Sequence, residues 1–483
     1  MKNVSVKQSS ENAAKRPRPL KVGMISLGCA KNRVDSEVML GLIKNAGYEL
    51  TNDCSDADIV VVNTCGFIES SKQEAIDTIL EVAELKKTGK LSGIVVAGCL
   101  AQRYGKDIAE FIPEADAVVG AFGYSNVCEA IRSIEERKKT VRSDSPANVK
   151  AAEESKSLCY FDDREINDLS YLDGERILTT PKSYAYLKIA EGCSNRCTYC
   201  AIPGIRGVYR SRPVENLVAE ARRLVSQGVK EIVVVAQDTT MYGTDLCGRS
   251  LLPELLSELD GIPELVFIRV LYLYPDEITE EILSAIAGCK KIVPYFDIPL
   301  QHISDTVLKR MNRRGNGKLY RNVIKELRRR IPGCVIRTSL ITGFPGETED
   351  EHRELVDFLK ETKLERVGVF IYSKEDGTPA ARMKGQIHPS TKKRRYNELM
   401  AAQQAVSLAF NSSRVGTVMK VLIDSVSDDG IFYVGRSYME APEEDGSVFF
   451  VAKDEHSIGD VVNVRILMAE EYDVTGEETA DSD

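Results

Sequence analysis

Three cysteines stand close together in the stretch EGCSNRCTYCAIP, residues 191–203. They are Cys193, Cys197 and Cys200, at the spacing C-x3-C-x2-C. Thiolate sulfur is a metal ligand, and a structural zinc site is normally closed by a fourth Cys or His. No histidine lies near the triad in the sequence; the four in the chain are His302, His352, His388 and His456. A [4Fe–4S] cluster held by three thiolates keeps one iron open, so the triad favours an iron–sulfur centre that binds a further molecule.

A second set of cysteines is spread along the first hundred residues. Each one follows an apolar run of strand type and precedes a helical pattern: Cys29 after KVGMISLG, Cys65 after IVVVNT and Cys99 after GIVVAG. The carboxyl ends of parallel strands share one edge of a sheet, and α/β proteins build their sites at that edge. These three cysteines, 34 to 36 residues apart, are therefore expected to converge on a second three-thiolate site. A zinc ion is the alternative metal for both triads.

Composition sets the frame for these sites. A chain of 483 residues predicts about three domains. With 43% apolar and 28% charged residues it has the make-up of a globular protein, and no stretch reaches the ~18 apolar residues of a membrane span. The N-terminus lacks the apolar core of a secretory signal, so twelve cysteines indicate a reducing cytoplasm, where they bind metal or react. Most of the six outside the triads are expected to be buried, inert thiols.

Pattern divides the chain into five segments, and the overall class is α/β. Residues 1–20 are expected to be a disordered tail. Residues 21–140 alternate strand and helix, which predicts an N-terminal parallel-sheet domain, and residues 141–178 are expected to be a polar linker with at most a small hairpin. Residues 179–411 alternate again over six strand candidates, which predicts a full or partial TIM-type barrel. Residues 412–483 contain short β-like runs, which predict a small all-β, OB-like barrel with an acidic tail.

The triad of Cys193, Cys197 and Cys200 has Tyr199 before its last cysteine and an expected strand before its first. This arrangement resembles the motif of the radical S-adenosylmethionine superfamily. In that superfamily the open iron binds S-adenosylmethionine, and reductive cleavage yields a 5′-deoxyadenosyl radical that abstracts hydrogen from a C–H bond. With an N-terminal three-cysteine domain and a C-terminal β-barrel, the chain resembles the methylthiotransferase family over about residues 21–470.

That resemblance implies two [4Fe–4S] clusters. Cys29, Cys65 and Cys99 match the family positions that hold an auxiliary, sulfur-carrying cluster, and Cys193, Cys197 and Cys200 match those that hold the radical cluster. One S-adenosylmethionine methylates the sulfur and a second one generates the radical. The product carries a CH3–S group in place of a hydrogen. No catalytic residue beyond the cluster ligands is identified.

Further residues at strand ends are expected to line the cofactor cleft. The stretch SLITGFPGET, residues 339–348, predicts a strand, a glycine–proline turn and a helix that begins with a capping box of Thr348 and Glu351. Gly343 and Gly346 are expected to let the backbone approach the cofactor, although a plain tight turn is the simpler alternative. The other expected cofactor-binding residues are Gln237, Asp238, Arg269 and Asp297, and Gln301 and His302 are further candidates. A structural role is the alternative for the last four, Arg269, Asp297, Gln301 and His302.

Two branches of the family differ in substrate: one modifies an adenosine of transfer RNA, the other the β-carbon of an aspartate in protein S12 of the small ribosomal subunit. Residues 411–483 hold 5 Lys or Arg and 17 Asp or Glu, a net charge of −12. RNA binding relies on basic residues, whereas an acidic barrel attracts a basic protein. The stretches 424–429 and 441–446 are expected to carry this attraction, with solubility as the alternative. The run KKRR at 392–395 is interpreted as a solvated helix face, although it keeps RNA contact open.

The sequence therefore favours the branch that methylthiolates the aspartate of ribosomal protein S12, either free or in the assembled small subunit. The alternatives are the tRNA-modifying branch and a non-catalytic iron–sulfur binding module. A flavodoxin or ferredoxin is expected to donate electrons, and no membrane partner is expected. The location that follows is the cytoplasm.

Overall fold

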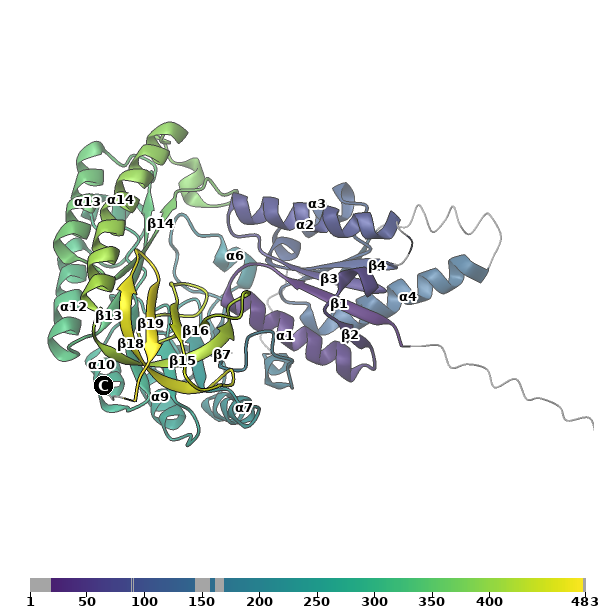
Figure 1. The fold of residues 1–483 in the computed structure, drawn as a ribbon. Coiled ribbons are helices and arrows are strands. Elements are labelled where there is room, and N and C mark those ends of the chain that lie inside the picture. Colours follow the sequence, from purple (N-terminus) through teal and green to yellow (C-terminus); the bar gives the residue numbers. More distant parts are fainter. Residues whose placement is uncertain (1–18, 88, 90, 144–156, 161–168, 481–483) are drawn as a thin grey trace, which may run out of the picture.

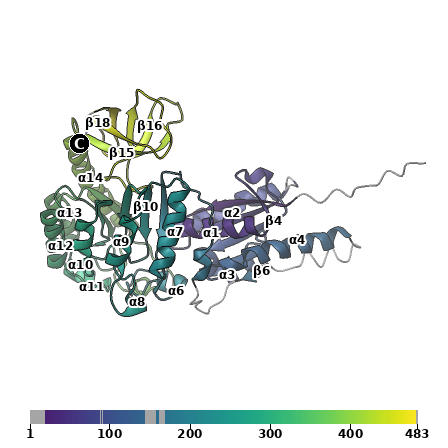
Figure 2. The same cartoon turned by 90° about the horizontal axis from the view of Figure 1, so that it is seen from below.

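The computed structural model describes residues 19–87, 89, 91–143, 157–160 and 169–480. Three bodies are visible in Figure 1: an N-terminal α/β domain, a larger α/β core and a small barrel. Figure 2 shows the barrel on one side of the core and the N-terminal domain on another. The tail expected over residues 1–20 lies almost entirely outside the described residues, as does much of the expected linker. The division of the chain at 140, 178 and 411 stays a prediction.

The N-terminal domain contains a six-stranded, wholly parallel sheet in the order β2-β1-β3-β4-β5-β6. Its strands are β1 (Lys21–Ser26), β2 (Glu49–Thr51), β3 (Ile59–Thr64), β4 (Gly93–Gly98), β5 (Ala117–Gly120) and β6 (Leu158–Tyr160). Its helices are α1 (Ala30–Asn45), α2 (Glu69–Lys87), α3 (Cys99–Phe111) and α4 (Val127–Ser143), and they cover both faces of the sheet (Figure 1). The central strands β3 and β4 are buried throughout, which explains their continuous runs of Ile, Val and Ala. Strand β6 adds an edge from within the expected linker.

The core contains a second six-stranded parallel sheet, in the order β14-β13-β12-β11-β10-β7. Its strands are β7 (Tyr184–Lys188), β10 (Glu231–Val235), β11 (Phe267–Val270), β12 (Ile292–Asp297), β13 (Val335–Thr342) and β14 (Arg366–Ile371). Its helices are α6 (Ile202–Arg206), α7 (Val214–Ser226), α8 (Thr244–Cys247), α9 (Leu252–Asp260), α10 (Glu280–Gly288), α11 (Asp305–Arg310), α12 (Gly317–Arg330), α13 (Glu349–Thr362) and α14 (Pro389–Ser413). These are the six strands expected from sequence. Because β14 and β7 are the two edges, the sheet is a partial barrel.

The C-terminal domain is a closed five-stranded barrel in the order β15-β16-β17-β19-β18, which confirms the expected small all-β fold. Its strands are β15 (Val418–Val426), β16 (Tyr433–Arg436), β17 (Val448–Val451), β18 (Val461–Ala469) and β19 (Val474–Glu478). Alternate residues of these strands, among them Val421, Ile423 and Phe450, point inward and fill the barrel. In the part of the chain that the structure describes, every helix is too short or too polar to cross a membrane.

Buried ion pairs fix the barrel to the core. Glu440, which follows β16, bonds Arg414 at 2.6 Å and Arg366 of the core sheet at 3.2 Å. Glu231 of β10 bonds Arg436 of the barrel at 2.5 Å. All five side chains are buried, so each charge depends on its partners for stabilisation in place of water.

We expect this attachment to weaken in acid. Burial raises the pKa of Glu440, but the charges of Arg414 and Arg366 outweigh that effect and bring the pKa down from 4.5 to about 2. A carboxyl whose folded pKa is depressed adds stability that is complete above the unfolded pKa and is lost as the pH falls through the folded one. Between pH 6 and pH 2 the contribution of Glu440 should therefore decline by about 3 kcal/mol.

Urea unfolding followed by circular dichroism across this pH range measures the decline. The Glu440→Gln variant should be less stable than the unmodified chain at pH 6, and the gap between the two should narrow toward pH 2. A gap that is independent of pH would contradict the assignment.

Candidate functional site

The first three cysteines meet at one edge of the N-terminal sheet. Cys29 is the N-cap of α1, Cys65 directly follows β3, and Cys99 is the first residue of α3. Strands β1, β3 and β4 are neighbours in the sheet, so the three thiols come from adjacent strand ends. Burial raises the pKa of Cys65, and it raises that of Cys99 to about 12; in both cases the neighbouring cysteines of the triad add to the rise. We refer to these three residues as the N-terminal triad.

Two glycines allow this convergence. Gly28 and Gly98 precede Cys29 and Cys99, and both have a positive φ, +92° and +98°. A Cβ on Gly28 would lie 2.8 Å from Cys65 Cβ, and one on Gly98 would lie 2.4 Å from Asn63 Oδ1. Any larger residue would therefore push the strand ends apart.

The other three cysteines, here called the core triad, lie in the loop between β8 (Ala190–Glu191) and α6. Cys193 and Cys197 are buried and Cys200 is partly buried. The loop is fixed by a hydrogen bond from the Cys193 N–H to the Gly207 carbonyl (3.0 Å), and the Tyr274 hydroxyl lies 3.7 Å from Cys197 Sγ. Burial raises the pKa of Cys193 to about 11 and that of Cys200 further, with the other cysteines of the triad contributing.

Both triads offer thiols that converge without a fourth Cys or His ligand nearby in the sequence. Among the described residues, no three Cys, His, Asp or Glu side chains approach closely enough to hold a single metal ion. A four-iron cube binds each thiolate through a different iron, so it requires thiols that gather around a space. In number and type, three Cys thiols in each set fit the ligands of a [4Fe–4S] cluster with one iron left for another ligand.

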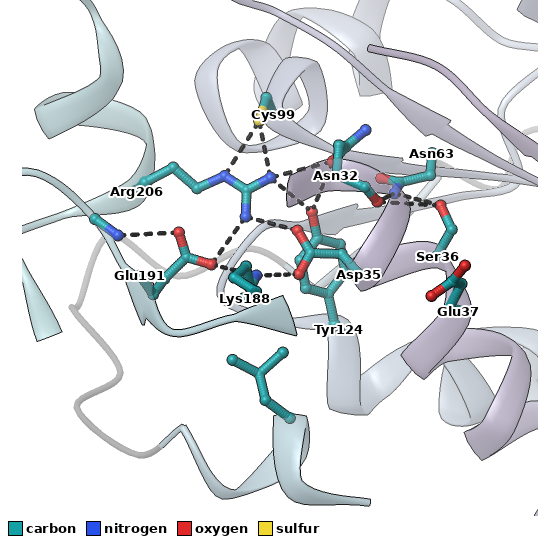
Figure 3. Close-up of polar contacts among 12 residues, drawn as sticks. Asn32, Asp35, Ser36, Glu37, Asn63, Cys99, Tyr124, Lys188, Glu191 and Arg206 are labelled. Carbon is teal, nitrogen blue, oxygen red and sulfur yellow. Dashed lines mark hydrogen bonds and ion pairs between the residues drawn. The ribbon is translucent and has the colours of Figure 1, made fainter. Parts of the chain in front are cut away.

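Arginines connect the two triads across the interface between the domains. Arg206, at the end of α6 in the core, donates from Nε and Nη2 to the Sγ of Cys99, at 3.2 and 3.1 Å (Figure 3). In the opposite direction, Arg103 of α3 lies close enough to Cys200 to lower its pKa, although burial dominates that pKa. Arg103 also donates to Glu375 of the core at 3.0 Å. Each triad thus faces a cation of the other domain.

Figure 3 shows the buried network that holds Arg206. Its Nη1 bonds Asp35 of α1 at 2.7 Å and Glu191 at 3.0 Å, and Lys188 of β7 bonds the same two carboxylates. Its Nη2 also donates to Asn32 Oδ1 at 3.1 Å. Two cations and two anions balance in a space closed to water. Burial raises the pKa of Glu191, but Arg206 and Lys188 outweigh it and hold the pKa at about 2.

Two of the expected cofactor residues lie beside the core triad. Asp238 follows β10 and accepts a hydrogen bond from Asn195, which lies between Cys193 and Cys197, at 2.7 Å. Burial raises the pKa of Asp238. The neighbouring Gln237 has a buried Oε1 without a hydrogen-bond partner among the described residues. An unsatisfied buried oxygen at this edge fits a ligand with an N–H or O–H donor.

Arg269 and Asp297 have other surroundings. Arg269 bonds Glu231 at 2.8 Å and the carbonyl of Tyr438 at 2.8 Å, so it joins the core to the barrel. Its expected role in cofactor binding stays a prediction. Asp297 ends β12 and accepts from the Tyr272 N–H and from Arg337, both at 3.0 Å. It therefore supports the strand ends near the triads.

The glycine–proline turn has the expected form. Gly343 and Gly346 both have φ of +76°, and the capping box of Thr348 and Glu351 is present at the start of α13. The turn closes on the buried carboxylate of Glu347, which accepts from the N–H groups of residues 343 and 344 and lies 3.8 Å from His302. His302 is fully buried, and whether it lines the cofactor cleft or has the structural role given as the alternative stays a prediction. Gln301 also has a positive φ, +70°.

The acidic stretch 441–446 keeps Glu443 and Glu444 exposed, but its carboxylates also have partners within the chain. Glu443 pairs with Arg33 of α1 at 2.7 Å, Glu444 pairs with Arg337, and Asp445 accepts from the Tyr295 hydroxyl at 2.6 Å. These carboxylates join the barrel to the other two domains. The amino-acid composition indicated the negative charge of this stretch, but it could not predict which residues these carboxylates pair with.

Two functional candidates were missed by the sequence, namely Arg206 and Lys31. Lys31 follows Cys29 by two residues, is 7% exposed and places its Nζ 3.3 Å from the centre of the Tyr272 ring. The sequence feature that could have indicated Arg206 and Lys31 is their closeness to a cysteine triad, but neither residue is part of a recognisable motif. The expectation that most of the other six cysteines are buried was wrong: only Cys334 is, and Cys159 and Cys247 are exposed.

Comparison with known proteins agrees with this geometry. Residues 21–120 match the model of an uncharacterised protein family, UPF0004, residues 187–359 match the radical SAM superfamily, and residues 415–478 match the TRAM domain. A radical S-adenosylmethionine methyltransferase, TsrM from Kitasatospora setae, shares the fold with a TM-score of 0.51 at 15% identity, over 75% of this chain and 74% of that one. Fold and site together define a radical SAM methylthiotransferase.

Relatives of high identity narrow this class. The chain is 48% identical to the ribosomal protein uS12 methylthiotransferase RimO of Acetivibrio thermocellus over 457 residues, 95% of this chain and 98% of that protein. It is 49% identical to the protein of the same name from Lachnoclostridium phytofermentans over 458 residues, 95% of this chain and 99% of that protein. The chain belongs to the RimO family.

Proposed function

We propose that this protein replaces a hydrogen on the β-carbon of an aspartate in ribosomal protein uS12 with a methylthio group. The observation that carries the proposal is the pair of three-thiol sites that face each other across the interface of the first two domains. The names of the relatives, ribosomal protein uS12 methylthiotransferases, give the acceptor protein. The tRNA-modifying alternative has in its favour only the basic run at 392–395, of which Arg395 is buried against Glu349 and Arg394 pairs with Glu349 and Glu398.

The two triads would each hold a [4Fe–4S] cluster, the N-terminal one auxiliary and the core one for S-adenosylmethionine. When bound, S-adenosylmethionine would supply the methyl group and, together with the core cluster, the hydrogen-abstracting radical, and the auxiliary cluster would supply the transferable sulfur. Gln237 has the unsatisfied Oε1 that a cofactor amine or hydroxyl would meet. Gly343 and Gly346 leave backbone free of side chains in the turn that follows β13.

The chain's own residues hold the site rigid and dry. Asp238 restrains the core-triad loop through Asn195, and Tyr274 covers Cys197. Arg206 keeps the Cys99 sulfur in a hydrogen-bonded position and is itself held by two carboxylates. Such support around metal ligands typically changes affinity or activity by about 10- to 100-fold.

For partners, we propose that uS12 approaches the exposed acidic residues of the barrel. Residues 411–483 carry a net charge of −12. Apart from the 441–446 loop, whose carboxylates pair with other domains, the exposed acidic residues include Asp428, Asp429, Asp454 and Glu455. A basic protein is attracted by such a surface, and RNA is repelled. We further propose that a flavodoxin or ferredoxin supplies electrons, that the acceptor is uS12 free or in the small subunit, and that the enzyme acts in the cytoplasm.

Mass spectrometry of reconstituted reactions tests the function. The anaerobic holoenzyme with S-adenosylmethionine and a reductant is mixed either with uS12 or with transfer RNA. We expect uS12 to gain one methylthio group on an aspartate and tRNA to remain unchanged. Modified tRNA beside unmodified uS12 would overturn the proposal.

A further inference from the structure

Lys31 is a buried lysine whose ammonium group forms no direct ion pair with any residue that the structure describes. Its side chain lies in the first turn of α1 and is 7% exposed. Its Nζ lies over the ring of Tyr272, 3.3 Å from the centroid, and within the described residues it has neither hydrogen bond nor ion pair. An ammonium group taken out of water without a bound anion costs several kcal/mol, so the burial of Lys31 is unfavourable for folding alone.

The charged groups that face Lys31 are already engaged. Asp297 gives one carboxylate oxygen to Arg337 and the other to the Tyr272 N–H, each at 3.0 Å. Glu444, from the barrel loop, also pairs with Arg337. Arg206 is held by its own carboxylates, and Cys29 belongs to the N-terminal triad. Asp297 and Glu444 are near enough to Lys31 to favour its charged form, but neither is within ion-pair distance of its Nζ, so within the described residues the ammonium group has no direct counter-ion.

Lys31 is connected to both triads. It is two residues from Cys29, and the ring beneath its Nζ belongs to Tyr272, two residues before Tyr274, whose hydroxyl contacts Cys197. A hydrogen that is to be replaced by sulfur has to reach the space between the triads. In an aspartate the carboxylate is bonded directly to the β-carbon, so a reacting β-carbon in that space carries its negative charge with it.

We propose that Lys31 binds the side-chain carboxylate of the acceptor aspartate and thereby selects aspartate over its uncharged amide. This inference rests on the proposed function. Lys31 thus determines specificity, and its contact with Tyr272 aims the ammonium group before the substrate arrives.

The test measures binding of two fluorescent peptides to the anaerobic holoenzyme, one with the acceptor aspartate of uS12 and one with asparagine in its place. The variants are Lys31→Gln, Lys31→Arg and, as a matched control, Lys393→Gln, another lysine that lies over a tyrosine ring. We expect Lys31→Gln to weaken binding of the aspartate peptide at least about 30-fold and to bring the two Kd values together. Lys31→Arg should retain a preference for aspartate, and Lys393→Gln should match the unmodified enzyme.

Two further measurements exclude other anions. Iron content and peptide-independent release of 5′-deoxyadenosine should be unchanged in Lys31→Gln. A lower iron content would show that Lys31 serves the cluster, and a higher KM for S-adenosylmethionine would show that it serves the cofactor carboxylate; either result overturns the inference. If the unmodified enzyme neither binds nor modifies the aspartate peptide, the proposed function fails as well. If it modifies that peptide while Lys31→Gln binds it equally well, only the inference fails.

Discussion

Replacement of Cys29 by alanine is expected to abolish methylthiolation while the cleavage of S-adenosylmethionine continues near the rate of the unmodified enzyme. Cys29 belongs to a triad built on the N-terminal sheet, whereas the core triad lies in one loop of another domain. Loss of one thiol from the first set leaves all three ligands of the second set in place. Roughly half of the bound iron should be lost, because one of two clusters no longer has its ligands.

The matching variant is Cys193→Ala, which should lose both activities, and Cys247→Ala is the control, because that thiol is exposed and outside both triads. Iron analysis, chromatography of 5′-deoxyadenosine and mass spectrometry of uS12 give the three readouts. Equal loss of cofactor cleavage in Cys29→Ala and Cys193→Ala would contradict separate roles for the triads.

The sequence was sufficient for features that are encoded locally. A cysteine after each apolar run is enough to place Cys29, Cys65 and Cys99 at one sheet edge, because parallel strands that follow one another in the chain usually lie side by side. The six strands of the core and a small all-β barrel followed from the same kind of pattern, although the last barrel strand, β19, was not among the expected runs. The capping box of Thr348 and Glu351 is likewise a three-residue relation that needs no knowledge of the fold.

Features that arise where domains meet were out of reach. Helix α1 carries Lys31, Asp35 and Glu37, charges that are typical of a solvated face, yet all three are buried because the core packs over them. The partners of these residues are more than a hundred positions away, as with Arg176 and Glu37 at 2.6 Å. The partners of the exposed carboxylates in the acidic loop 441–446 were out of reach for the same reason. Charge can be counted in a sequence, but whether it faces water depends on docking.

Arg206 is the residue whose replacement tests this docking most directly. Arg206→Met would leave the buried carboxylates of Asp35 and Glu191 with Lys188 as their only cation. Removing one partner from a buried charge network costs about 3–5 kcal/mol, so we expect a clear fall in the midpoint of thermal unfolding. Asp35→Asn in the same chain should restore part of that stability, since Lys188 alone then balances the remaining carboxylate of Glu191, and a double-mutant cycle measures the coupling.

Arg206→Lys separates folding from chemistry. A lysine keeps the positive charge beside Asp35 and Glu191, but a single ammonium group cannot reproduce the planar fork that holds these carboxylates and Cys99 Sγ together. We expect near-normal thermal stability, unchanged cleavage of S-adenosylmethionine and methylthiolation reduced about 10- to 100-fold. A shifted reduction potential of the auxiliary cluster, with an unshifted radical cluster, would show that the loss acts through Cys99. If both reduction potentials and the methylthiolation rate stay as in the unmodified enzyme, Arg206 has only a structural role at the domain interface. Its two hydrogen bonds to the Cys99 sulfur would then be dispensable for catalysis.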